Sequence, residues 1–183
     1  MHQVRIHGRG GQGVVTAAEL LSVAAFAEGR HAQAFPTFGS ERTGAPVVAF
    51  CRIDERPIRS REPIAEPDTL IVQDPTLLHQ VDLFAGLHPG GLVLLNSART
   101  LQELGLDDTG FRIVTLPATD LARKHLGRPV PNAVLLGGFA ALTGVVSLDA
   151  VVAAIREKFK GAIGEQNAVA ARVAYEQLEA VHA

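Results

Sequence analysis

Short runs of apolar residues alternate with amphipathic segments through the first two thirds of the chain. Runs rich in valine, isoleucine and leucine that end in polar or turn residues are typical of β-strands. The pattern predicts strands at residues 4–7, 45–53, 68–74, 91–97 and 111–118, one from residue 31 to a break at Pro36, and a short return strand at Pro57-Ile58 after a turn at Asp54-Glu55. Strands that alternate with helices predict an α/β domain with a largely parallel sheet.

Helical spacing of apolar residues predicts the other elements. The first helix, residues 14–29, ends at Gly29, a residue type that often follows the last helical turn. Further helices are expected at residues 75–81, 119–127 (N-cap Thr119 or Asp120, terminator Gly127), 132–143, 148–160 (N-cap Ser147) and 165–183, the last with an apolar stripe of Ala170, Ala174, Leu178 and Val181. We therefore expect one three-layer, Rossmann-like domain over residues 1–183 with a helical final third.

Composition narrows the function classes. The chain has 183 residues, which suits one domain with a substantial core. It carries 17 Lys and Arg against 19 Asp and Glu residues and no basic run, so nucleic acid is not an expected partner. Cys51 is the only cysteine, which excludes an internal disulfide or a cysteine-ligated cluster and fits a reducing cytoplasm. The first residues do not resemble a signal peptide.

The longest uncharged stretch lies between Arg128 and Asp149. Its length approaches that of a membrane span. Its prolines and the Gly137-Gly138 pair would make a poor lipid-facing helix, and no Trp or Tyr marks an interface. We therefore expect a buried or partner-covered helix there and no membrane association.

A glycine-rich loop follows the first predicted strand. Residues 8–13 read Gly-Arg-Gly-Gly-Gln-Gly and formally match the G-x-G-x-x-G pattern, in which a helix start binds a phosphate. A NAD site would need an acidic residue about 20 positions further on, and residues 31–36 contain none. The glycines could instead only permit tight packing of strand on helix. Gln12 favours a ligand, because its amide could donate to a phosphate, a carboxylate or a partner's carbonyl oxygen.

A second unusual stretch covers residues 35–53. Phe35 and Phe38 precede a polar cluster that includes Glu41 and Arg42. Phenylalanines are rare in solvated loops. The stretch is expected to pack against another chain, or else within this domain with Glu41 and Arg42 as a local ion pair.

The two stretches together resemble the gamma subunit, or gamma domain, of the 2-oxoacid:ferredoxin oxidoreductases, the pyruvate:ferredoxin oxidoreductase family. The family pattern is a strand, G-x-G-G-Q-G, a helix, and a segment like P-x-x-G-x-E-R-x-G-x-P-V-x-A-F-x-R-I, which matches residues 8–13 and 36–53. Residues 67–78 and 131–144 also resemble later family segments. Thr43 departs from the pattern, because many members carry a second arginine there.

The resemblance implies a reaction and its cofactors. The family oxidatively decarboxylates a 2-oxoacid on thiamine diphosphate, passes electrons to iron–sulfur clusters and transfers the acyl group to coenzyme A. It implies that thiamine diphosphate, magnesium and the clusters reside on alpha, beta and ferredoxin-like delta subunits, with a flavin-bearing subunit as a further option. The 2-oxoacid stays open among pyruvate, 2-oxoglutarate, branched-chain acids and phenylglyoxylate.

For this chain the resemblance implies a share in assembly and in the coenzyme A site, at a subunit interface. The residues predicted to bind are Gly8, Arg9, Gly10, Gly11, Gln12, Gly13, Arg42 and Thr43. No residue is predicted to be catalytic or to ligate a metal. His7 is expected to be structural, and Asp68 and Asp74, at opposite ends of one strand, to serve as turn and cap. Two alternatives stay open: a stand-alone nucleotide-binding module or NAD(P)-dependent enzyme, and a purely structural assembly subunit.

Overall fold

The structure is a computed structural model that describes residues 1–37 and 42–182. Its strands are β1 (His2–Arg9), β2 (His31–Pro36), β3 (Pro46–Asp54), β4 (Thr69–Val72), β5 (Leu92–Asn96) and β6 (Arg112–Leu116). Its helices are α1 (Val14–Ala27), the 3-10 helix η1 (Pro75–His79), α2 (Ala118–Leu126), α3 (Asn132–Thr143), α4 (Leu148–Lys158) and α5 (Gly161–His182).

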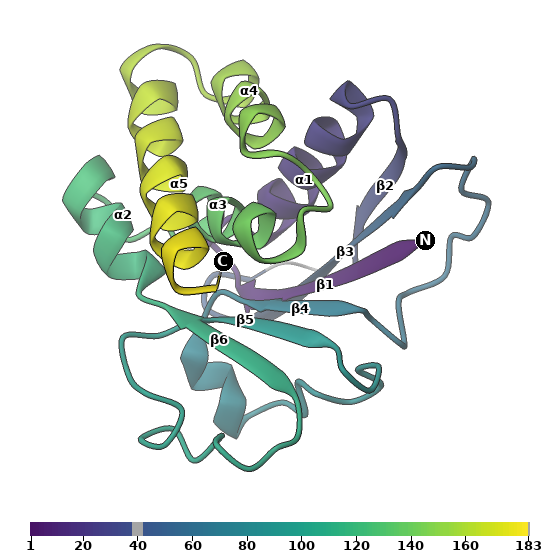
Figure 1. The fold of residues 1–183 in the computed structure, drawn as a ribbon, viewed down its shortest axis with the longest axis vertical. Helices are drawn as coiled ribbons and strands as arrows, with labels where there is room; N and C mark the ends of the chain where they lie inside the picture. Colours follow the sequence, from purple (N-terminus) through teal and green to yellow (C-terminus); the bar gives the residue numbers. More distant parts are fainter. Residues whose placement is uncertain (38–41, 183) are drawn as a thin grey trace.

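The strands form one sheet in the order β2-β3-β1-β4-β5-β6 (Figure 1). Strand β1 is parallel to β4, and the pairs β4–β5 and β5–β6 are also parallel. Strand β3 is antiparallel to both of its neighbours, β1 and β2. In the register of the sheet, Val4 of β1 pairs with Thr69 of β4 on one side and with Cys51 of β3 on the other. The carboxyl ends of β1, β4, β5 and β6 therefore share one edge of the sheet, which is where open α/β sheets bind ligands.

Helices cover one face of the sheet (Figure 1). Large side chains of this core, such as Ile6, Leu94 and Phe139, are fully buried. The predicted buried helix between Arg128 and Asp149 is confirmed, because α3 is buried from Asn132 to Ala140. None of the helices in the described part of the chain combines the length and hydropathy that crossing a bilayer requires.

The opposite face of the sheet is covered by η1 and by irregular segments (Figure 1). Its smaller core packs Leu77 of η1 and Leu83 against Val93 and Leu95 of β5. Strands β4 and β5 are consequently buried along their whole length. This arrangement is typical of parallel strands covered on both faces, and it confirms the predicted α/β class with a mostly parallel sheet.

Arg5 of β1 anchors irregular segments beneath the sheet. Its side chain is only 8% exposed. Its guanidinium donates hydrogen bonds to the carbonyl oxygens of Ile64, Ala65, Leu83 and Ala85, at 2.8–3.4 Å. Because a buried cation is stable only when its donors are satisfied, these four carbonyls stabilise the loops around it as well as the arginine.

The predicted return strand at Pro57-Ile58 is wrong. Side chains of the sheet, and no strand ladder, bind the backbone just after this segment: Gln33 Nε2 donates to Ser60 O at 2.7 Å, and Arg52 Nη2 donates to Glu62 O at 2.6 Å. Pro57 also lacks the N–H that a ladder needs.

Three helix details also differ from the sequence pattern. The segment predicted as a helix at residues 75–81 forms only the short 3-10 helix η1, after Asp74 as N-cap. Helix α2 has Pro117 at its N-cap, two or three residues before the predicted caps Thr119 and Asp120. Val181 is 71% exposed, because the last turn of α5 extends beyond the core. Ser147 does cap α4 as predicted, by accepting a hydrogen bond from Ala150 N.

Gly137 lets α3 and α5 approach closely, and this predicts a mutational contrast. A methyl group at Gly137 would lie 2.1 Å from the carbonyl oxygen of Ala171, whereas one at Gly138 would meet only leucine side chains at 3.0–3.4 Å. We expect Gly137→Ala to lower the free energy of unfolding by about 2–3 kcal/mol and Gly138→Ala to change it by less than about 1 kcal/mol. Urea unfolding measures both, and equal losses would contradict the close approach.

Candidate functional site

The loop from Gly8 to Gly13, called the glycine loop below, joins β1 to α1 at the carboxyl edge of the sheet. Gly11 and Gly13 have φ angles of +91° and +71°, a region that favours glycine. Gly13 is the N-cap of α1 and Gly11 is exposed. No side chain of the described residues caps α1, and its first turn contains no acid. The amino end of α1 thus retains free N–H groups and the positive end of its dipole.

Two other glycines of the loop are required by close approach. A Cβ at Gly8 would lie 2.5 Å from Val14, and one at Gly10 would lie 2.0 Å from the carbonyl oxygen of Arg42. Gly10 N donates to Ala45 O at 2.9 Å, and Gly44 N donates to Gly10 O at 3.1 Å. The glycine loop and residues 42–45 therefore form one continuous surface.

The structure brings the predicted binding residues together. Gly10 forms a β-bridge with Thr43, and both Thr43 and Arg42 are exposed beside the loop. Phe38 and Glu41, predicted to take part in packing and in an ion pair, lie outside the described residues. Phe35 packs within this chain, since its ring lies 5.0 Å from that of Phe50.

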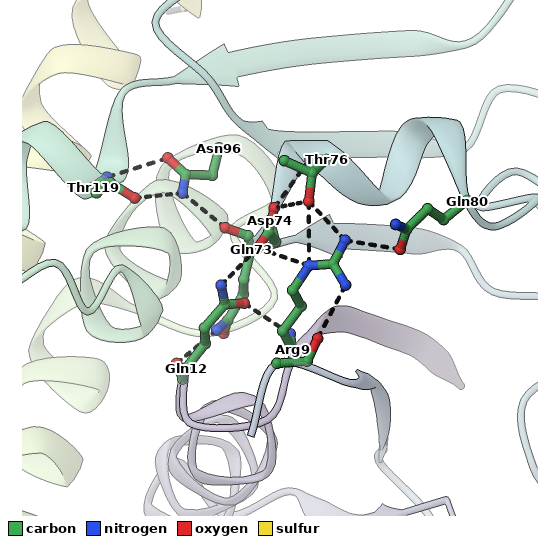
Figure 2. A network of polar contacts seen from close by, with 9 residues as sticks. Arg9, Gln12, Gln73, Asp74, Thr76, Gln80, Asn96 and Thr119 are labelled. Atoms are coloured by element: carbon green, nitrogen blue, oxygen red, sulfur yellow. Dashed lines mark hydrogen bonds and ion pairs between the residues drawn. The ribbon is translucent and has the colours of Figure 1, made fainter. Parts of the chain in front are cut away.

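Asp74, two residues after the end of β4, binds side chains of the glycine loop (Figure 2). Its Oδ2 accepts a hydrogen bond from Gln12 Nε2 at 2.7 Å and lies 3.2 Å from Arg9 Nε. Its Oδ1 accepts from Thr76 N at 3.0 Å and Thr76 Oγ1 at 2.6 Å. Burial opposes ionisation, but the hydrogen bonds from Thr76 and Gln12 and the charge of Arg9 lower the pKa of Asp74. We call Arg9, Gln12, Asp74 and Thr76 the Asp74 cluster.

The Asp74 cluster changes what the loop offers a ligand. Gln12 Oε1 accepts from Arg9 N at 2.8 Å, so both ends of this amide bind the chain itself. Arg9 Nη1 donates to Gly44 O and its Nη2 donates to Thr76 and Gln80 (Figure 2). The side chains of Arg9 and Gln12, which were expected to face a ligand, are thus engaged within the chain, whereas Arg42 and Thr43 stay exposed.

Further polar residues gather at the same edge, beyond those predicted to bind. Gln73 Nε2 donates to Gln12 O, and Asn96 Nδ2 donates to Gln73 O and Thr119 Oγ1, each at 2.8–2.9 Å (Figure 2). Asn132, the first residue of α3, donates from Nδ2 to Gly13 O at 3.3 Å. In the sequence, the signal for these contacts is a polar residue at the end of a strand, as with Gln73 and Asn96. The spacing along the sequence does not show which of these residues bind one another.

The described residues suit binding better than bond-breaking chemistry. Burial raises the pKa of the Cys51 thiol to about 12, so this cysteine is no nucleophile. His2 hydrogen-bonds Thr69 Oγ1 at the opposite edge of the sheet, but Thr69 is 1% exposed and closed to a substrate. Within residues 1–37 and 42–182 no three His, Cys, Asp or Glu side chains are grouped to hold a metal ion.

Fold and site define a class: a Rossmann-like α/β domain with a glycine loop between β1 and α1, at the carboxyl edge of its parallel strands. The family model of pyruvate ferredoxin/flavodoxin oxidoreductase matches residues 3–177. The chain belongs to this family, as a gamma-type subunit of a 2-oxoacid:ferredoxin oxidoreductase.

Relatives of known name agree with this assignment. The pyruvate synthase subunit PorC of Methanothermobacter marburgensis is 50% identical over 98% of both chains. The common gamma subunit of the pyruvate/ketoisovalerate oxidoreductases of Thermococcus litoralis is 48% identical over 97% of both. The crystal structure of pyruvate oxidoreductase subunit PORC from Thermotoga maritima has 36% identity and a TM-score of 0.83, and covers 96% of this chain and 95% of that one.

His7, beside the glycine loop, predicts a pH dependence of stability. It is 5% exposed and its Nε2 accepts from Arg5 Nε at 2.9 Å. Burial, and then the charge of Arg5, lowers the pKa of His7 from 6.5 to about 4. The unfolded chain therefore binds the proton more readily than the folded chain between these values, and stability falls as pH falls.

We expect the free energy of unfolding to drop by about 2 kcal/mol between pH 7.5 and pH 5 from this group alone. Urea unfolding at the two pH values measures the drop, and an NMR titration of the His7 ring gives its pKa directly. A His7 pKa near 6.5 in the folded chain would contradict the assignment.

The Asp74 cluster predicts energetic coupling between two loops. Asp74→Ala removes hydrogen bonds to a charged, poorly exposed carboxylate, so we expect a loss of about 2 kcal/mol in the free energy of unfolding. Gln12→Ala removes one of the same bonds. A double-mutant cycle by urea unfolding should give a coupling of about 1 kcal/mol, and additive losses would show that the two side chains act independently.

Proposed function

We propose that the glycine loop contributes part of the coenzyme A site of the assembled oxidoreductase by binding a phosphate group of the coenzyme at the amino end of α1. In the same proposal, partner alpha, beta and ferredoxin-like delta subunits carry thiamine diphosphate, magnesium and the iron–sulfur clusters. Residues 1–183 act as one gamma-type domain in the cytoplasm, where the lone Cys51 stays a thiol.

One observation carries the coenzyme A proposal. The loop's own side chains point to Asp74, while the exposed Gly11 and the uncapped start of α1 leave backbone N–H groups for an external acceptor. Such an N–H array at a helix start favours phosphate. The negative charge of Asp74 is offset by its ion pair with Arg9, so it does not outweigh the positive end of the α1 dipole.

The placement of the iron–sulfur clusters on partner subunits follows from the cysteine content of this chain. One cysteine cannot ligate a four-cysteine cluster, so electrons from the decarboxylated 2-oxoacid must leave through another subunit. Thiamine diphosphate on a partner subunit would supply the acyl group that the thiol of coenzyme A accepts. The Thermococcus relative is named as common to the pyruvate and ketoisovalerate enzymes, which supports the view that the partner subunits select the 2-oxoacid.

A structural role is the second candidate, and residues 42–45 favour it. Arg42, Thr43 and Gly44 are exposed and are joined to the glycine loop by backbone hydrogen bonds. A partner subunit could therefore dock on the loop surface and exclude coenzyme A from it. A NAD(P) site fits less well, because β2 ends at Pro36 without an acidic residue.

A charge contrast at Gly11 separates these functions. Asp and Asn have nearly the same size and both tolerate a positive φ, so Gly11→Asp and Gly11→Asn differ chiefly in charge. In the assembled enzyme we expect Gly11→Asp to raise the KM for coenzyme A about three- to tenfold above that of Gly11→Asn, with kcat unchanged. Repulsion between the carboxylate and the phosphate is the cause, so added salt should reduce the difference.

Steady-state kinetics and native mass spectrometry of the complex check this expectation. Equal KM values for the two variants, in a complex that still assembles, would contradict the binding of a phosphate at the glycine loop. Failure of both variants to assemble with the partner subunits would favour the structural role.

A further inference from the structure

The outer edge of β2 is an open side of the sheet. Strand β2 lies beyond β3 at one end of the strand order (Figure 1), and none of its six residues is buried. The strand at the other end, β6, instead buries Ile113, Val114 and Leu116. An edge strand presents a row of backbone groups that can pair with another strand. The edge of β2 is therefore the side on which this sheet can be extended.

The register of the sheet identifies the backbone groups that point outward from β2. Just beyond the strand, Thr37 N donates to Val48 O at 2.9 Å, so this antiparallel pair is a hydrogen-bonded one. Hydrogen-bonded and non-hydrogen-bonded pairs alternate along an antiparallel ladder. Every second residue back from Thr37 therefore bonds to β3, and the residues between them, Ala32, Ala34 and Pro36, direct their backbone groups outward. Outside the sheet ladder, no described residue hydrogen-bonds the backbone of Ala32 or Ala34.

A small hollow with a positive rim lies beside this edge. It has a volume of about 220 Å³ and is lined by Gln33, Ala34, Phe35 and Arg61. This volume suits one side chain, because small-molecule sites usually have roughly 300–1,000 Å³. Arg61 is exposed, as is Arg59, and neither forms an ion pair with any residue that the structure describes.

Arg52 adds a buried positive charge next to the hollow. It is 4% exposed, and its guanidinium carbon lies 5.6 Å from the centre of the Phe35 ring. Its donors bind Gln3 Oε1, Gln33 Oε1 and Glu62 O at 2.6–3.1 Å, and these are amide and carbonyl oxygens. The carboxylate of Glu62 acts on Arg52 only through its charge. Together with the two exposed arginines, Arg52 therefore makes the surroundings of the hollow positive.

We propose that the edge of β2 docks an extended, acidic segment of a partner subunit of the oxidoreductase, which joins the sheet as a further strand. Backbone hydrogen bonds to Ala32 and Ala34 hold the segment, as in other proteins that bind a peptide at a sheet edge. Side chains alternate along a strand, so an acidic side chain of the segment enters the hollow and pairs with Arg61. The proposal concerns this edge alone and does not rest on a phosphate at the glycine loop.

Charge favours an acidic segment over a second copy of this chain. Two β2 strands paired antiparallel about Gln33 would also satisfy the outward groups, with Ala32 of one copy opposite Ala34 of the other. That arrangement would bring the Arg61 side chains of the two copies close together, and like charges at paired strands are destabilising. An acidic segment replaces this repulsion by attraction.

Hydrogen exchange of the isolated chain and of the assembled enzyme tests the added strand. In the isolated chain we expect fast exchange at the amides of Ala32 and Ala34 and protection at Gln33 and Phe35, which bond to β3. Assembly should slow exchange at Ala32 and Ala34 about tenfold or more. Unchanged exchange at these two amides would overturn the proposal and leave the arginines as a guard against edge-to-edge aggregation. Their protection in a dimer of the isolated chain would assign the edge to a second copy and overturn it as well.

Two pairs of variants test the contacts themselves. Ala34→Pro removes the outward N–H, whereas the control Ala34→Val adds as many carbon atoms and keeps the N–H. The double variant Arg59→Glu, Arg61→Glu reverses the charge beside β2, and its control is Arg112→Glu on β6. We expect Ala34→Pro and the double variant each to weaken the binding of this chain to the remaining subunits about tenfold, and the controls to bind as the unchanged chain does.

Native mass spectrometry measures this binding when the chain is titrated into a complex of the remaining subunits. Equal losses with Ala34→Pro and Ala34→Val would overturn the backbone contact. Unchanged binding of the double arginine variant, or an equal loss with Arg112→Glu, would overturn the acidic character of the segment. Melting temperatures of the isolated variants, matched within about 2 °C, exclude loss of folding as the cause.

Discussion

The carboxylate of Asp74 holds together the two segments on which the candidate site depends. It binds the side chains of Gln12 and Arg9 from the glycine loop and both donors of Thr76 from η1. A poorly exposed carboxylate is stable only with such partners, so the loop, the end of β4 and the start of η1 are ordered as one unit. Gln12 and Arg9 are thereby engaged within the chain, and α1 begins without a side-chain cap.

The remaining polar residues extend this unit across the edge of the sheet. Gln73, Asn96 and Asn132 link the ends of β4 and β5 and the start of α3 to the loop. None of these contacts is catalytic, and each fixes the place of a helix start or a strand end. The result is a surface whose elements are fixed relative to one another, which the proposed coenzyme site requires.

Elements with a strong local signal were predicted well. The runs that became β4 and β5 are apolar throughout because parallel strands covered on both faces need no polar side. Ser147 marked the start of α4 by its capping hydroxyl. Predictions failed where distant groups competed with local preference: the chain after the expected return strand at Pro57-Ile58 is held by Gln33 and Arg52, which bind the carbonyls of Ser60 and Glu62. Val181 followed the helical period but lies past the edge of the core.

The amino-acid sequence by itself determined the α/β class, the place of the glycine loop after the first strand and the family pattern, because these depend on residue type and local spacing. Tertiary structure decided which groups of the glycine loop are available to a ligand. Asp74 and Gln73, which are 62 and 61 positions from Gln12 in the sequence, are brought to the loop by the pairing of β1 with β4, and no local pattern encodes that pairing. The same pairing turned Arg9 and Gln12 from expected ligand contacts into internal supports. The packing of α3 against α1 brought Asn132, at the start of α3, beside Gly13.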